Sequence, residues 1–218
     1  PYLHAVCQLA MAWISPLVGD FDGALRAASA SLKQLRGQDE PFWTALAVGS
    51  LGSLETAVGR HDDALHHLRE ARDLAGRFDN AWLSAWSRVQ LGTLALMRGQ
   101  LEEARELLDE GLDMSLVARS TRSVSLCLAA FARLVFVSGD PERAALVAGA
   151  AEGLRQRASL RPWPLLRRAE AVLLAQVRPA LGADRFDQVF AAGSRLNQRE
   201  AVAAVRTGPA PTSGRPER

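Results

Sequence analysis

Long hydrophobic runs and amino-terminal sorting signals are missing from this chain of 218 residues. No apolar stretch reaches the roughly 20 residues that a helix needs to cross a bilayer, so we expect no membrane-spanning segment. The chain opens with Pro1 and Tyr2, without the charged start and cleavage site of a secretory signal. We therefore expect a cytoplasmic location, and the absence of an initiator methionine suggests a part of a longer protein.

Lysine is almost absent, since Lys33 is the one lysine among 26 basic residues, a bias that we attribute to genomic base composition. The net charge of +2 conceals an asymmetry: residues 1–118 hold 10 basic and 16 acidic groups, and residues 119–218 hold 16 and 8. A basic half can indicate a nucleic-acid surface. The arginines are scattered over several predicted helices, however, so a solvated face is favoured and nucleic-acid contact is kept as an alternative.

Signatures of catalysis are also lacking. No glycine-rich loop follows a strand or precedes Lys-Ser, which excludes a phosphate-binding loop of that type, and no nucleophile sits in the strained turn of a hydrolase. The densest group of metal-ligating side chains is His61, Asp62, Asp63, His66 and His67. A third firm ligand on one helix face is not evident. We expect no catalytic residue, no metal site and no cofactor.

A forty-residue repeat organises the rest of the chain. Glycine marks four expected turns, and alanine follows five positions later, in Gly19/Ala24, Gly59/Ala64, Gly99/Ala104 and Gly139/Ala144. Before each turn a large apolar residue precedes a small one, in Met11-Ala12, Leu51-Gly52, Leu91-Gly92 and Phe131-Ala132. Self-similarity at a fixed period indicates stacked structural repeats.

We therefore predict an all-α solenoid in a single domain, with one helix-turn-helix unit in each of the ranges 1–38, 39–78, 79–118 and 119–158. Pro162 and Pro164 prevent the last of these helices from continuing. Residues 159–206 are predicted to form a helical cap at the end of the stack. Residues 207–218 are rich in proline, glycine, serine and charge, and are predicted to be a disordered tail.

The two cysteines, Cys7 and Cys127, occupy the same position of the repeat, where the other copies have Ala47 and Ser87. This alignment predicts a position that requires a small buried side chain. A disulfide would have to bridge several stacked layers, so we expect two unreactive thiols.

The pattern resembles the tetratricopeptide repeat, as Leu91, Gly92, Gly99, Ala104 and Leu108 show most fully. The period differs, because that motif repeats at about 34 residues. In the family the first helix of each pair lines a concave groove that holds a partner. The resemblance places these residues in the groove: Trp13, Trp86, Thr93 and Arg133. Tryptophan and arginine often dominate binding energy, although both tryptophans could instead fill the layers between helices.

Residues 140–205 resemble the C-terminal helical region of large bacterial signal-transduction ATPases of the maltose-regulon activator and LuxR type, on the segments PERAALVAGAAEGLRQRA and LLAQVRPALGADRFDQVFAAGSRLNQREAVAAV. The resemblance implies an upstream ATPase, or a serine/threonine kinase or nucleotide cyclase fused to it. It also implies an array that senses a protein segment or small effector. We thus expect a non-catalytic sensor and interaction domain, with a purely structural or dimerising scaffold as a further alternative.

Overall fold

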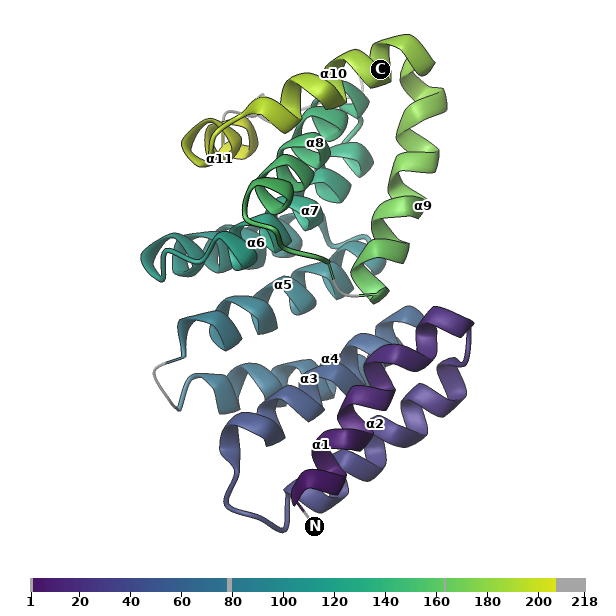
Figure 1. The fold of residues 1–218 in the computed structure, drawn as a ribbon, viewed down its shortest axis with the longest axis vertical. Coiled ribbons are helices and arrows are strands. Elements are labelled where there is room, and N and C mark those ends of the chain that lie inside the picture. The colour runs from purple at the N-terminus through teal and green to yellow at the C-terminus, as the bar shows by residue number, and fades with distance from the viewer. Residues whose placement is uncertain (1, 78–79, 163, 207–218) are drawn as a thin grey trace, which may run out of the picture.

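The described part of the protein, residues 2–77, 80–162 and 164–206 of a computed structural model, is helical and contains no strand. Four antiparallel helix pairs come first (Figure 1). Their bounds are α1 Tyr2–Ile14, which the 3₁₀ helix η1 Ser15–Val18 extends, α2 Phe21–Leu35, α3 Pro41–Ala57, α4 His61–Ala75, α5 Ala81–Met97, α6 Leu101–Val117, α7 Thr121–Val137 and α8 Pro141–Arg157. Three more helices follow: α9 Pro164–Leu181, α10 Ala183–Arg195 and α11 Gln198–Arg206. We call α1, α3, α5 and α7 the A helices and α2, α4, α6 and α8 the B helices.

The turn from each A helix to its B helix depends on one glycine in the left-handed region. The φ angles are 82° at Gly19, 82° at Gly59, 74° at Gly99 and 90° at Gly139. Side chains with a Cβ atom rarely adopt this conformation, which explains why the same residue recurs at the same place. The predicted turns and the all-α solenoid are thereby confirmed.

The small residue next to each large one allows the two helices of a pair to approach closely. A Cβ atom on Gly92 would press against the side chain of Leu108 on its own B helix. The large residue faces the other way, because Leu91 shares a buried cluster with Leu68 of the preceding B helix. The sequence pair of large and small residues therefore encodes both interfaces of an A helix.

Residues 159–206 differ from the predicted terminal cap. Only α10 and α11 cover the end of the stack, and α10 lies so close to α8 that a Cβ on Gly149, Gly153 or Gly193 would strike the backbone of the facing helix. Helix α9 instead runs lengthwise along the stack and contacts η1 and α1 of the first pair as well as α7 and α8 of the fourth (Figure 1). After the break at Pro162, α9 buries Leu173 and Val177 in the core cluster that also contains residues of α7 and α8.

Two arginines of α8 hold the cap by satisfying helix C-termini, whose last carbonyls lack partners within the helix. Arg143 donates to the carbonyl oxygens of Ala204 and Val205 at the end of α11, at 2.7 and 2.8 Å. Arg157 donates to those of Ser194 and Leu196 at the end of α10, each at 2.6 Å.

Two further expectations can be compared with the structure. Cys127 is buried but Cys7 is exposed, so the prediction of a buried side chain was wrong for the first repeat. The reason is that no B helix precedes α1 among the described residues. The predicted tail, residues 207–218, lies outside the described residues. None of the described helices combines the length and the apolar character that a membrane crossing requires.

Candidate functional site

A cavity of about 380 Å³, which we call the groove cavity, lies between the A helices and α9. Helices α3, α5 and α7 supply most of its wall, Trp13 of α1 and Phe21 of α2 close the first-repeat end, and α9 contributes residues between Leu166 and Leu173. The lining is mainly apolar. Pockets that bind small molecules or side chains commonly have volumes of several hundred Å³ and apolar walls.

All four residues assigned to the groove line this one cavity: Trp13, Trp86, Thr93 and Arg133. Trp86 has only 2% of its surface exposed and belongs to the buried core of the first two pairs. It therefore fills a layer between helices and also forms part of the cavity wall. Thr93 donates a hydrogen bond from its hydroxyl group to the Val89 carbonyl at 2.8 Å. This hydroxyl is therefore already satisfied, and Thr93 contributes mainly to the shape of the cavity wall.

The tryptophans are held in fixed orientations. The indole N–H of Trp13 donates to the hydroxyl of Ser50 at 2.9 Å, which links the first pair to the second. The rings of Trp82 and Trp86 stack with centroids 6.1 Å apart and planes inclined by 11°. The six-membered ring of Trp86 lies where a Cβ atom on Gly49 would stand. Rigid aromatic surfaces of this kind lose little conformational entropy when a partner binds.

The charged lining is strongly unbalanced. Glu170 is the one acidic residue that lines the cavity among the described residues, and the basic ones are Arg122, Arg133, Arg155, Arg161 and Arg168. Arg155 is buried and pairs with Glu170 at 2.7 Å and with Glu152 at 2.9 Å. Burial raises the pKa of Glu170, and Arg155 opposes this rise. Glu170 is thus paired with Arg155, and the other four arginines give the cavity lining a net positive charge.

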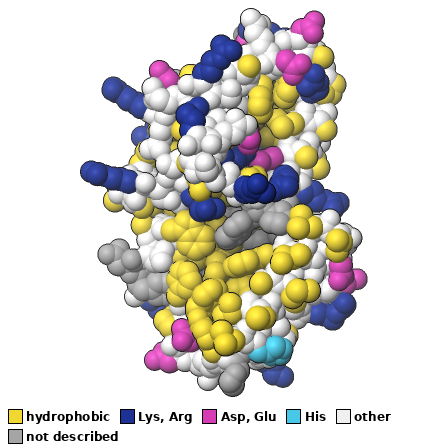
Figure 2. Space-filling view, in the orientation of Figure 1, with side chains coloured by type: hydrophobic (Ala, Val, Ile, Leu, Met, Phe, Trp, Pro, Cys, Tyr) yellow, Lys and Arg dark blue, Asp and Glu magenta, His cyan; other side chains and the backbone are white. Residues whose placement is uncertain are grey.

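The remaining arginines have weaker partners. Arg133 donates to the sulfur of Met97 at 3.0 Å, and the guanidinium of Arg168 lies over the Phe21 ring. Arg122 and Arg161 are exposed, and neither forms an ion pair with an acid of the described part. Figure 2 shows basic side chains across the middle of this face, next to a broad hydrophobic area. The groove cavity is therefore an apolar slot with a basic border.

Sequence reasoning missed the contribution of α9 and of residues that face it, such as Phe21 and Arg168. The forty-residue period assigns positions only to the A helices. The run from Leu165 to Leu181 indicates a helix, but nothing in that run specifies that it turns back over the first pair. The contact between α9 and η1 depends on tertiary packing alone.

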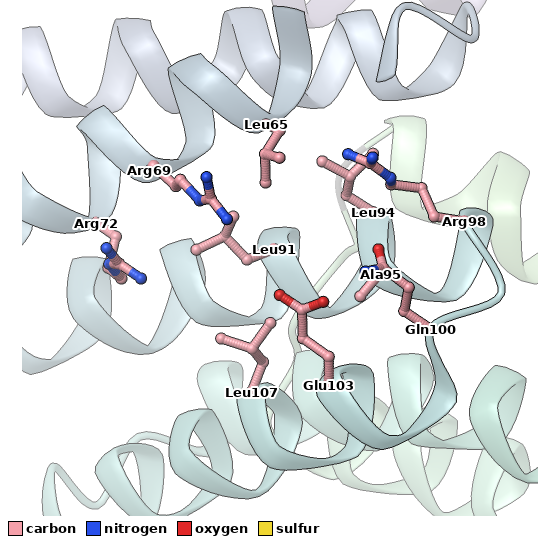
Figure 3. A pocket seen from close by; sticks show the side chains of 10 residues that line it. All are labelled: Leu65, Arg69, Arg72, Leu91, Leu94, Ala95, Arg98, Gln100, Glu103 and Leu107. Atoms are coloured by element: carbon pink, nitrogen blue, oxygen red, sulfur yellow. The ribbon is translucent and has the colours of Figure 1, made fainter. Parts of the chain in front are cut away.

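A second hollow, of about 60 Å³, lies between α4, α5 and α6 (Figure 3). Arg69, Arg98 and Glu103 border it over a leucine floor. It is large enough for a few water molecules only, and we assign it no binding role.

Two of the histidines singled out in the sequence, His66 and His67, lie with ring centroids 5.4 Å apart. His67 places Nδ1 2.7 Å from Oε2 of the buried Glu55 on α3. This hydrogen bond raises the pKa of His67. Within the described ranges, no group of three or more His, Cys, Asp or Glu side chains is placed to hold a metal ion. His67 therefore has a structural partner.

Comparison with known proteins agrees with this geometry. The tetratricopeptide-repeat family model matches residues 43–116. Repeats of this family generally mediate protein–protein interaction. No curated protein sequence matches the chain.

Two solved structures share the fold. One is BtubC (BKLC) from P. vanneervenii, with a TM-score of 0.56 and 19% identity over 95% of this chain and 81% of that one. The other is Rap protein complexed with competence and sporulation factor, with a TM-score of 0.58 and 16% identity over 94% of this chain. The match spans 64% of the Rap chain. At such identities the likeness concerns the fold alone. An ATPase, kinase or LuxR-type parent stays a prediction.

Proposed function

We propose that this chain is a non-catalytic interaction module that holds a segment of a partner protein in the groove cavity. The observation that carries the proposal is that four A helices and α9 converge on one mainly apolar cavity. The module would report binding to an ATPase or kinase joined to it, as the resemblance to signalling ATPases implies. A small effector in the same cavity is the alternative occupant.

The chemistry of the lining favours a segment that carries both an apolar side chain and a carboxylate. Trp13 and Trp82, which are partly exposed, offer flat apolar surface, and Arg122, Arg133 and Arg161 offer guanidinium groups at the border. Arginine binds carboxylates with two parallel hydrogen bonds when the geometry allows. Aromatic and arginine side chains together are the usual centres of binding energy in interfaces.

Selection of random dodecapeptides displayed on phage tests the proposal. We expect enrichment of peptides that combine aromatic or large aliphatic residues with aspartate or glutamate. Ala130 lines the cavity, so Ala130→Trp should fill it and weaken the selected peptides by at least about tenfold, equivalent to about 1.4 kcal/mol. Retained circular dichroism would show that the blocked variant is folded.

Charge removal provides a matched comparison. Arg122→Gln with Arg133→Gln should weaken an acidic peptide, whereas Arg26→Gln with Arg199→Gln, which removes the same charge from exposed positions outside the cavity lining, should not. The proposal would be overturned if the selected peptides bound with unchanged affinity to Ala130→Trp and to the double variant Arg122→Gln with Arg133→Gln. Tight, strongly salt-dependent binding of a DNA duplex that the arginine pair abolishes would favour the nucleic-acid alternative instead.

A further inference from the structure

The first A helix leaves exposed a stripe whose equivalent in α5 is buried. The stripe, which we call the α1 stripe, consists of Leu3, Cys7, Met11 and Ile14. Leu3, Met11 and Ile14 are 75%, 55% and 52% exposed. The residues forty positions later are Trp43, Ala47, Leu51 and Leu54, and those eighty positions later, in α5, are Leu83, Ser87, Leu91 and Leu94. In α5 all four of these residues are at most 4% exposed.

In the later pairs this face is covered by the preceding B helix. Helix α2 packs on α3, α4 on α5 and α6 on α7. Leu91 and Leu94 share a buried cluster with Ala64 and Leu68 of α4. Figure 3 shows Leu65 of α4 pointing toward Leu91 and Leu94. The equivalent surface of α1 carries the same kind of apolar side chains, and none of the described helices covers it.

The composition of α1 also differs from that of an end that faces water. Residues 1–18 contain no Asp, Glu, Lys or Arg. Repeat arrays need terminal units with a polar outer face to stay soluble, and charged side chains on an exposed helix face are the normal way to provide one. Figure 2 shows hydrophobic side chains crowded over the lower half of the molecule, where α1 and its neighbours lie in Figure 1.

We infer that the α1 stripe is a repeat-to-repeat interface and that it docks the B helix of a further repeat of the same kind. The occupant is an amphipathic helix with alanine and leucine along one face, as in α4, where Ala64, Leu68 and Ala71 are fully buried. Such a helix would pack on α1 at the repeat positions through which α4 packs on α5. Its small residues let it approach α1 as closely as α4 approaches α5.

A graft that reuses the protein's own repeat tests this inference. A copy of residues 41–80 is placed directly before Pro1, so that the copied α4 precedes α1 as α4 precedes α5. Cys7 is the reporter, because it lies on the stripe and is exposed, whereas Cys127 is buried and burial raises the pKa of its thiol to about 12. We expect the graft to slow the reaction of Cys7 with Ellman's reagent by about an order of magnitude.

Ile14→Asp provides the matched control. In the ungrafted chain Ile14 is half exposed, so the substitution should leave the circular dichroism and the melting temperature nearly unchanged. In the grafted chain it places a charge beneath the copied helix and should restore the reactivity of Cys7. A second graft, a copy of residues 81–120 in the same place, presents α6 instead of α4.

Two outcomes contradict the inference. If neither graft protects Cys7 although both add the expected helical signal, the α1 stripe does not dock a repeat helix. If the ungrafted chain sediments as a dimer with Cys7 protected, and Ile14→Asp makes it monomeric with Cys7 reactive, the occupant is a second copy of the chain. Neither result depends on what binds in the groove cavity.

Discussion

Arg168 on α9 places its guanidinium carbon 5.3 Å from the centre of the Phe21 ring on α2. The two residues belong to opposite ends of the array, so this contact helps to hold α9 over the groove cavity. Among the α9 residues whose burial is described, Leu173 and Val177 are buried, and Glu170 forms an ion pair with Arg155, so these residues hold the helix against the fourth pair and the cap. The attachment of α9 to η1 and α1 of the first pair should therefore depend strongly on the contact between Arg168 and Phe21.

Loss of this contact should loosen α9 selectively. For Arg168→Gln we expect a loss of about 0.5–1 kcal/mol, the usual strength of a cation–π contact near the surface. Hydrogen exchange followed by mass spectrometry should show faster exchange in residues 164–181, with α3 and α5 unchanged. Arg167→Gln, an exposed neighbour on the same helix, serves as the control. Equal exchange in both variants would show that Phe21 does not anchor α9.

The fit of Trp86 against Gly49 predicts a sensitive point in the cavity wall. In Gly49→Ala the new methyl group would occupy the space of the Trp86 ring, and the resulting shift should cost about 1–3 kcal/mol in the free energy of unfolding. Urea unfolding followed by tryptophan fluorescence measures it. Gly37→Ala is the matched control, because the nearest atom to its new Cβ is 3.6 Å away. A comparable loss in both variants would contradict this account.

The ion pair between Arg155 and Glu170 predicts a strong asymmetry between single and double variants. Arg155→Met should destabilise the protein by about 3 kcal/mol, because it leaves a largely buried carboxylate without its partner. Adding Glu170→Leu should recover most of this loss. The exposed pair of Arg178 and Asp187 gives the control, since Arg178→Met should cost less than about 1 kcal/mol. Thermal unfolding of the four proteins decides the question.

His67 predicts a dependence of stability on pH. Its hydrogen bond to Glu55 raises its pKa above the ordinary 6.5, so the folded state holds the proton more tightly than the unfolded state. The resulting stabilisation is complete below pH 6.5 and is lost as the pH rises through the folded-state pKa. Melting temperatures across this range should fall in the native protein and fall less in His67→Gln. His66→Gln should behave like the native protein.

The regular part of the fold could be predicted because its causes are local and repeated. Gly19, Gly59, Gly99 and Gly139 each supply a conformation that other residues avoid, and the small residues beside them set the distance between paired helices. The resemblance to the tetratricopeptide repeat placed Trp13, Trp86, Thr93 and Arg133 on one side of the A helices, and these residues line the cavity, while their role in binding stays a prediction. Asn197 and Glu200 cap α11 reciprocally, at 2.8 and 3.0 Å, as their spacing of three indicates.

The rest depends on contacts that no short pattern encodes. The path of α9 depends on its contact with η1, and Cys7 is exposed because no described helix packs on its side of α1. Gly149 and Gly153 stood four apart in the sequence, a spacing that lets helix backbones touch, yet in an alanine-rich helix it did not specify α10 as the partner. The sequence showed that α8 carries small residues suited to close packing. It did not show which helix packs against them.

Linear arrays of repeats ordinarily melt by peeling from either end, since each unit touches only its neighbours. Here the chain is tied back on itself, because α9 leaves the fourth pair and reaches the first. The helix pairs should consequently fold and unfold in one cooperative transition. A substitution that destabilises the first pair should therefore also destabilise the fourth.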